Sequence, residues 1–214
     1  MKSKTITLLA ITTLMAVGCK KESENKKPEN EKVKDTIQVV TTEKENKASY
    51  HKLVTAKNIS FDVSTTGKGS LKQLTIKPSG LELNSEIHLD IEGEIVNTEI
   101  ADLNSDQFPE VLIYTTSAGS GSYGSVIAYS TNKGKSLSQI TFPETAGNSK
   151  IGKGYMGHDK FSLEGNTLVQ EFPIYKKEDP NCCPTGGTRH IQYKLEKGEA
   201  SEQFIIDKVT ENLR

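Results

Sequence analysis

The chain has 214 residues with 27 basic and 28 acidic side chains, which gives a formal net charge of −1 at pH 7. A charge so close to zero, with no basic cluster, argues against nucleic acid as a partner. Beyond an apolar N-terminal segment, no hydrophobic run is long enough to cross a bilayer. The length allows one domain whose core needs no disulfide bonds.

The N-terminal segment is predicted to be a targeting signal. Lys2 and Lys4 precede a short apolar run at residues 6–17, and small residues lead to Cys19. This pattern is typical of a bacterial lipoprotein signal peptide, residues 1–18, with Cys19 as the lipidated first residue of the mature chain. An ordinary secretory signal with an incidental cysteine is the alternative. We expect acyl chains, palmitate among them, to anchor the protein to the membrane of the cell envelope, at the outer membrane.

The next segment is predicted to be a spacer. Residues 19–49 mix lysine, glutamate and asparagine with few apolar side chains. Such a segment cannot bury a core, so it is predicted to be a disordered tether. Residues 50–214 then form the single folded domain, in which we find no internal repeat.

The domain is predicted to be all-β. Residues 87–100 alternate apolar and polar side chains and are interpreted as one strand or two, with a bulge or bend at Gly93. Residues 207–213 are predicted to form a short helical segment. Short strands at regular spacing with turn signals indicate an antiparallel β-sandwich with short peripheral helical turns. The other predicted strands cover residues 59–64, 71–76, 111–116, 125–130, 161–163, 167–175, 190–195 and 204–206.

The stretch between two of these strands is the strongest candidate for a binding site. Residues 117–124 place glycines and serines around a single aromatic side chain, Tyr123. A loop that only turns a hairpin needs about two to five residues. This loop is longer, and loops carried by rigid strands are where binding residues gather. A flexible hairpin tip without function is the alternative.

A second motif resembles a calcium loop. Oxygen-bearing side chains stand at alternate positions in Asp102, Asn104 and Asp106, followed by Glu110. In calcium loops such side chains converge on a hard cation. Gln107, however, stands where these loops have glycine, and the usual glutamate at the twelfth position is missing. An Asx-type turn is the alternative. Any calcium ion here would brace the loop, and no cofactor is expected to be required.

Two adjacent cysteines, Cys182 and Cys183, lie in a proline-flanked loop. Thiols of exported proteins tend to oxidise, so a vicinal disulfide or a bond to another chain is expected. A bond between sequence neighbours would strain a local turn without closing a long loop. Zinc with His190 as a third ligand is the rival, but no second CxxC or HxxxH completes a tetrahedral site.

No catalytic motif stands out in the chain. None of its four histidines lies in a nucleophile-elbow or HExxH setting, and Ser120 lacks the strand–turn–helix context that activates a serine. The chain is therefore predicted not to be an enzyme. A hydrolase that uses His158 is the weaker alternative.

Several sequence blocks, taken in order, resemble the periplasmic inhibitors of invertebrate-type lysozyme. The resemblance extends from about residue 102 to about residue 195. The blocks are SGSY at 120–123, GYMGHD at 154–159, FPIY at 172–175, PTGGTR at 184–189 and QY at 192–193.

The resemblance implies an antiparallel β-sandwich that forms homodimers and pushes an exposed loop into the substrate cleft of lysozyme. It assigns the contact to Ser120 and Tyr123, and amides around Gly121 would add donors. Lysozyme cleaves its substrate between two carboxyl groups. A serine hydroxyl can donate to a carboxylate, while a tyrosine ring can fill a sugar subsite.

Arg189 falls within one of the matching blocks, and Arg214 is the only other arginine. A planar bidentate donor would suit an acidic cleft, so Arg189 is a further candidate contact. Alternatively, it ties down its own turn. The chain is thus expected to be a lipid-anchored lysozyme inhibitor. The competing hypothesis is a calcium-stabilised cell-surface binding module without inhibitory activity.

Overall fold

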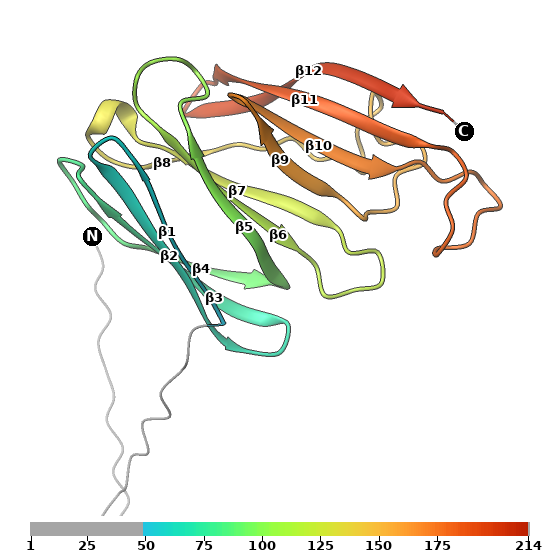
Figure 1. Cartoon of the computed structure of the whole chain (residues 1–214), viewed down its shortest axis with the longest axis horizontal. Coiled ribbons are helices and arrows are strands. Elements are labelled where there is room, and N and C mark those ends of the chain that lie inside the picture. Colours follow the sequence, from blue (N-terminus) through green and yellow to red (C-terminus); the bar gives the residue numbers. More distant parts are fainter. Residues whose placement is uncertain (1–48, 214) are drawn as a thin grey trace, which may run out of the picture. The chain divides into compact units, whose positions relative to one another are not determined.

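The computed structural model describes residues 49–213 (Figure 1). The expected signal peptide, the lipidated Cys19 and the tether up to residue 48 lie outside these residues. Within them the chain forms strands and one short 3-10 turn, η1 (Asn132–Gly134). The strands are β1 (Tyr50–Ala56), β2 (Ile59–Lys68), β3 (Leu71–Ser79), β4 (Ile87–Glu92), β5 (Glu94–Ala101), β6 (Glu110–Thr116), β7 (Gly124–Ser130), β8 (Ser138–Ile140), β9 (Lys160–Glu164), β10 (Thr167–Pro173), β11 (Thr188–Lys197) and β12 (Glu202–Asn212).

The strands form three antiparallel sheets of four, each built from strands that are consecutive in the chain. The first sheet has the order β1-β2-β3-β4, the middle sheet β5-β6-β7-β8, and the third β12-β11-β10-β9. Each sheet is therefore a meander, and the longest connection within a sheet is residues 174–187, between β10 and β11. No helix in residues 49–213 is long and apolar enough to cross a membrane.

The middle sheet packs on both of its faces. Val111 and Ile113 of β6 belong to a core shared with the first sheet. Leu112 and Tyr114, which point the other way because strand side chains alternate, belong to a second core shared with the third sheet. All four side chains are at most 2% exposed. The fold is therefore a double sandwich in which β6 lies at the centre.

The predicted all-β sandwich is confirmed, but its layering was not anticipated. The sequence of β6 does not alternate apolar and polar residues, and this pattern is typical of a strand buried on both faces. The buried side chains of β2 and β3 alternate with more exposed ones, by contrast, because the first sheet is an outer sheet with one face in water.

The helical segment predicted at residues 207–213 is wrong. β12 continues to Asn212, and its residues pair with β11, for example Val209 with Ile191 and Thr210 with His190. The neighbouring strand supplies backbone partners that local propensity does not reveal. In addition, β1 and the short β8 were not among the strands predicted from the sequence.

Residues 87–100 form two strands, as one of the two interpretations held, and these strands belong to different sheets. Gly93 lies between β4 and β5 with φ +103°, and a Cβ there would lie 1.9 Å from the Thr116 carbonyl oxygen. Only glycine tolerates that approach. Gly93 thus lets the chain pass from the first sheet to the middle one.

Candidate functional site

The loop at residues 117–123 projects from the centre of the double sandwich, because it joins β6 to β7. The last pair of the ladder is Thr116 with Gly124. Beyond it, Ser117 N–H donates to the Tyr123 carbonyl (2.8 Å), and Tyr123 N–H donates to Ser117 Oγ (3.0 Å). Ser122 N–H closes the tip on the Gly119 carbonyl (3.0 Å). The loop is therefore internally bonded and starts from the most buried strand.

A second segment, residues 154–159, supports this loop from outside. His158 N–H donates to the Gly121 carbonyl at 2.7 Å. Gly157 has φ +84°, and a Cβ there would lie 2.1 Å from the same carbonyl oxygen. The two segments therefore touch backbone to backbone, which requires glycine at position 157.

Tyr123 lies on this support while remaining accessible. Its ring packs edge-on against Tyr155, with centroids 5.7 Å apart, and it covers Gly121. The residue is nevertheless 47% exposed, and Ser120 is exposed as well. Met156 is 38% exposed and lies between Tyr155 and Gly157, both of which contact Tyr123. The result is an apolar, hydroxyl-bearing tip that is already ordered.

A carboxylate anchors the base of the site. Asp159 Oδ2 accepts hydrogen bonds from Gly124 N–H (2.9 Å) and from the Tyr155 hydroxyl (2.6 Å). Its Oδ1 accepts from Gln170 Nε2 (2.6 Å), which lies in the core of the third sheet. Burial raises the pKa of Asp159 above its ordinary value, although these three donors lower it. Burial and the Asp159 hydrogen bond raise the pKa of Tyr155, so its hydroxyl stays a donor. Asp159 thus ties Tyr155 and the start of β7 to the third sheet.

A third segment, residues 174–187, completes the support. Tyr175 N–H donates to the Gly154 carbonyl (2.9 Å), and the Tyr175 hydroxyl donates to the Asn181 carbonyl (2.8 Å). Asn181 Nδ2 then reaches the Ser120 carbonyl at 3.4 Å. The SGSY, GYMGHD and FPIY blocks therefore converge at one end of the fold, as does the loop that leads to Arg189.

Tyr155, Asp159 and Gln170 were not predicted as site residues. For Tyr155 and Asp159 the sequence did offer a signal, the block 154–159, whose glycines indicate close backbone contacts.

The two cysteines lie in this third segment. Both are exposed free thiols, and Cys183 N–H donates to the Pro180 carbonyl (3.0 Å). A vicinal disulfide therefore stays a prediction for the oxidised protein. Zinc gains no support, because His190 is paired with Glu171 (Nδ1–Oε2, 3.3 Å). Nor do residues 49–213 contain any group of three or more His, Cys, Asp and Glu side chains placed to hold a metal ion.

Arg189 does not reach the surface, contrary to its candidacy as a partner contact. It is 4% exposed, and its Nε and Nη2 donate to Glu211 Oε1 (2.9 and 2.6 Å). Its Nη1 donates to the carbonyls of Ile151 and Lys153, and its guanidinium lies 5.6 Å from the centroid of the Phe172 ring. These contacts favour the alternative in which Arg189 ties down its own surroundings. It holds the chain that leads into residues 154–159.

Replacing Arg189 by alanine is expected to lower the free energy of unfolding by about 2–4 kcal/mol. The change removes the donor to the buried Ile151 carbonyl and to the partly buried Lys153 carbonyl, and it removes the partner of Glu211, whose side chain is 37% exposed. Breaking a fully buried pair costs about 3–5 kcal/mol, so this partly exposed pair is expected to cost somewhat less. Urea unfolding followed by circular dichroism measures the change. The exposed Lys177→Ala in the neighbouring loop is the control, expected within about 0.5 kcal/mol of wild type. An Arg189→Ala chain as stable as wild type would contradict this role.

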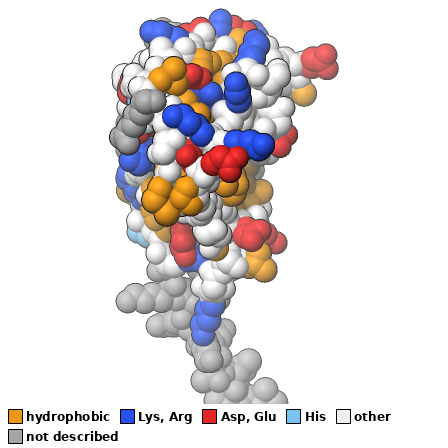
Figure 2. Space-filling view, turned by 90° about the vertical axis from the view of Figure 1, so that its right-hand side faces the viewer, with side chains coloured by type: hydrophobic (Ala, Val, Ile, Leu, Met, Phe, Trp, Pro, Cys, Tyr) orange, Lys and Arg blue, Asp and Glu red, His pale blue; other side chains and the backbone are white. Residues whose placement is uncertain are grey.

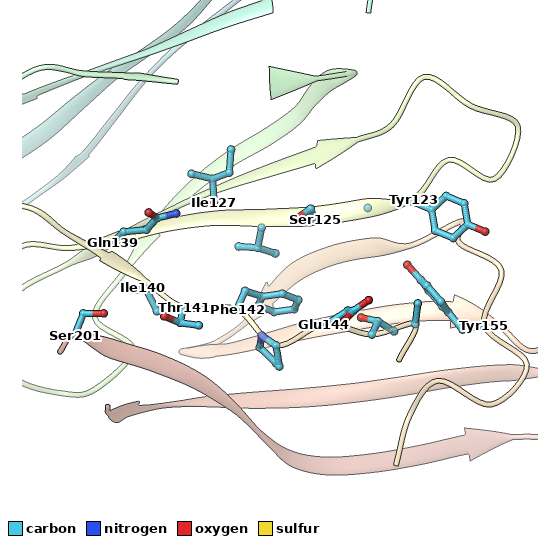
Figure 3. A pocket seen from close by; sticks show the side chains of 15 residues that line it. Tyr123, Ser125, Ile127, Gln139, Ile140, Thr141, Phe142, Glu144, Tyr155 and Ser201 are labelled. Carbon is cyan, nitrogen blue, oxygen red and sulfur yellow. The ribbon is translucent and has the colours of Figure 1, made fainter. Parts of the chain in front are cut away.

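A groove runs from the tip along the free side of β7 (Figure 3). Its volume is about 690 Å³. Tyr123 and Tyr155 stand at one end and Ser201 at the other, with Glu144 as the one charged residue of its lining. β8 pairs with only the last part of β7, residues 128–130, which leaves the first part facing the groove. The tip therefore stands beside a concave, mainly uncharged surface.

The end of the domain toward the right of Figure 1 carries mixed side chains (Figure 2). Hydrophobic side chains form small patches there among lysine, aspartate and glutamate, and no single sign of charge prevails on this face. Such a surface favours recognition by shape and local hydrogen bonds over long-range attraction.

The comparisons with known proteins identify one family. Residues 82–151 match the model of the family described as periplasmic lysozyme inhibitor of I-type lysozyme. No curated protein and no solved structure matches the chain. The match confirms the family resemblance and contains one of the five sequence blocks, SGSY at 120–123. It covers the loop 117–123 and its strands β6 and β7, and it ends before the supporting segments at 154–159 and 174–187.

Proposed function

We propose that this protein, similar over residues 82–151 to the periplasmic inhibitors of I-type lysozyme, blocks lysozyme by inserting the loop 117–123 into the substrate cleft. The observation that carries the proposal is the tip itself. Tyr123 and Ser120 are exposed, yet two separate segments, residues 154–159 and 174–187, hold the backbone beneath them. An ordered loop loses little conformational entropy on binding, so more of its contact energy appears as affinity.

The chemistry of the tip suits a glycosidase cleft. Lysozyme carries two carboxyl groups on either side of the bond it cleaves. The Ser120 hydroxyl can donate to one of them, and charge-assisted hydrogen bonds of this kind are stronger than neutral ones. The Tyr123 ring offers an apolar face of about the width of a sugar ring and a hydroxyl for a polar partner. Met156 would extend the apolar contact at the rim.

The anchoring part of the proposal concerns residues outside the described domain. A lipid on Cys19 and a tether over residues 19–49 would hold the inhibitor at the envelope while its tip reaches enzyme that attacks the peptidoglycan. Globomycin, which blocks lipoprotein signal cleavage, is expected to cause an uncleaved precursor to accumulate. The homodimer implied by the resemblance also stays a prediction, and sedimentation of the unlipidated chain tests it.

The proposal is tested by measuring the activity of invertebrate-type, chicken-type and goose-type lysozymes with increasing amounts of the purified unlipidated chain. We expect tight inhibition of the invertebrate-type enzyme and weaker or no inhibition of the other two. A chain that slows none of the three would overturn the proposal. The calcium-stabilised binding module would then become the better hypothesis.

A further inference from the structure

We propose that the loop between β5 and β6, together with the first residue of β12, binds a calcium ion. This site lies at the opposite end of β6 from the loop 117–123. The inference therefore does not depend on lysozyme inhibition and concerns the stability of the fold.

The loop already has the backbone that the motif requires. Asp102 accepts hydrogen bonds from the N–H groups of Asp106 (3.1 Å) and Gln107 (2.9 Å). Asn104 Oδ1 also accepts from Asp106 N–H, at 2.9 Å. Gln107 has φ +75°, the left-handed conformation that glycine normally supplies in calcium loops. Gln107 thus takes the conformation of the glycine it replaces, and the first objection raised by the sequence is removed.

The stronger sign is a buried carboxylate with a free oxygen. Glu110 is 0% exposed. Its Oε2 accepts from Leu103 N–H (2.8 Å), but its Oε1 is buried with no hydrogen-bond partner among the described residues. A buried carboxylate oxygen without a donor is unfavourable, because nothing replaces the water it has lost. Burial raises the pKa of Glu110 to about 8, and the charges of Glu202, Asp106 and Asp102 add to the shift.

A second carboxylate comes from a distant part of the chain. Glu202 Oε1 accepts from Asn104 Nδ2 (2.8 Å), whereas its Oε2 is buried without a partner among residues 49–213. Two carboxylates from different sheets therefore meet at the loop, each with one unsatisfied oxygen. Glu202 supplies the further acidic ligand that the sequence did not find after Glu110, and only the pairing of β11 with β12 brings it there.

The composition of the cluster favours calcium over other ions. The side-chain atoms that would bind the ion are all carboxylate or amide oxygens, which are the ligands that hard cations prefer. Zinc sites are instead built mainly from imidazole or thiolate groups. Asn104, Asp106 and Glu202 also line an open pocket of about 560 Å³, together with Lys133, Lys197, Glu196 and Glu199. Residues 49–213 hold no group of three His, Cys, Asp or Glu side chains already placed around one point, so Glu110 and Glu202 are expected to move closer together when the ion binds.

The test is calorimetric titration of the EGTA-treated, unlipidated full chain with calcium chloride, together with thermal melting. We expect one ion per chain and a melting temperature that rises with calcium concentration, because a ligand that binds only the folded state stabilises it. Magnesium chloride at the same concentrations is expected to give a smaller shift. No binding heat and no thermal shift at millimolar calcium would overturn the proposal.

Two variants locate the ion. Glu110→Gln and Glu202→Gln are each expected to weaken calcium affinity at least tenfold. Glu199→Gln, an exposed neutralisation in the same pocket, is the matched control and is expected to bind as wild type does. Glu202→Gln keeps the test decisive if the fully buried Glu110→Gln fails to fold. Unchanged affinity in Glu202→Gln would overturn the assignment, whatever the chain does to lysozyme.

Discussion

A chain carrying both Ser120→Ala and Tyr123→Ala is expected to lose at least 100-fold in affinity for the lysozyme that the wild-type chain inhibits. Truncating a central aromatic anchor typically costs about 2–4 kcal/mol, and a lost hydrogen bond to a charged group adds about 1.5–3 kcal/mol. A 100-fold loss corresponds to about 2.7 kcal/mol. Inhibition constants and melting temperatures are the measurements. The melting temperature is expected to stay near that of wild type, because both side chains are exposed.

Matched variants in the same loop show whether the side chains or the loop as a whole matter. Gly119→Ala adds a Cβ that meets nothing within 4 Å, so it is expected to inhibit normally. Tyr123→Phe keeps the ring and its packing on Tyr155, so it isolates the contribution of the hydroxyl. If the double alanine variant inhibits as strongly as Gly119→Ala does, the contact surface lies elsewhere.

Gly157→Ala is expected to weaken inhibition at least tenfold although residue 157 need not touch the enzyme. A Cβ at this position would lie 2.1 Å from the Gly121 carbonyl oxygen, so the loop 117–123 must move. That movement breaks the hydrogen bond from His158 N–H and displaces Ser120 and Tyr123 from the arrangement that favours binding. The measurement is again the inhibition constant, with stability followed by urea unfolding.

Gly165→Ala is the control for backbone strain. Gly165 also has a positive φ, +62°, but a Cβ there would meet nothing within 4 Å. Both variants are expected to lose about 1–2 kcal/mol of stability through the left-handed conformation, and only Gly157→Ala is expected to lose inhibition. Equal inhibition by the two variants would show that the support from residues 154–159 is not needed.

The roles of Arg189 and Asp159 show how far a residue's neighbours decide what it does. Arg189 was a candidate for the partner contact because arginine is rare in this chain and suits carboxylates. In the fold it is enclosed by Phe172, Glu211 and the carbonyls near Ile151. Asp159 was noted only as part of the block 154–159, yet it is the acceptor that joins Tyr155 and β7 to the third sheet. Residue type alone could not separate these roles, because some of the partners, such as Gly124 for Asp159 and Ile151 for Arg189, are 35 and 38 residues away in sequence.

What the sequence determined by itself was local. Alternation in residues 87–100 was enough to predict one strand or two, because apolar and polar residues alternate along a strand that has one face in water. The glycine–serine loop with Tyr123 and the spacing from Asp102 to Glu110 were also readable without a structure. Tertiary structure decided what depends on distant pairing. It placed β6 between two cores, extended β12 along β11 in place of a helix, and brought Glu202 to the loop after β5. Backbone partners and buried neighbours of this kind come from segments far apart in the chain, so local sequence patterns do not indicate them.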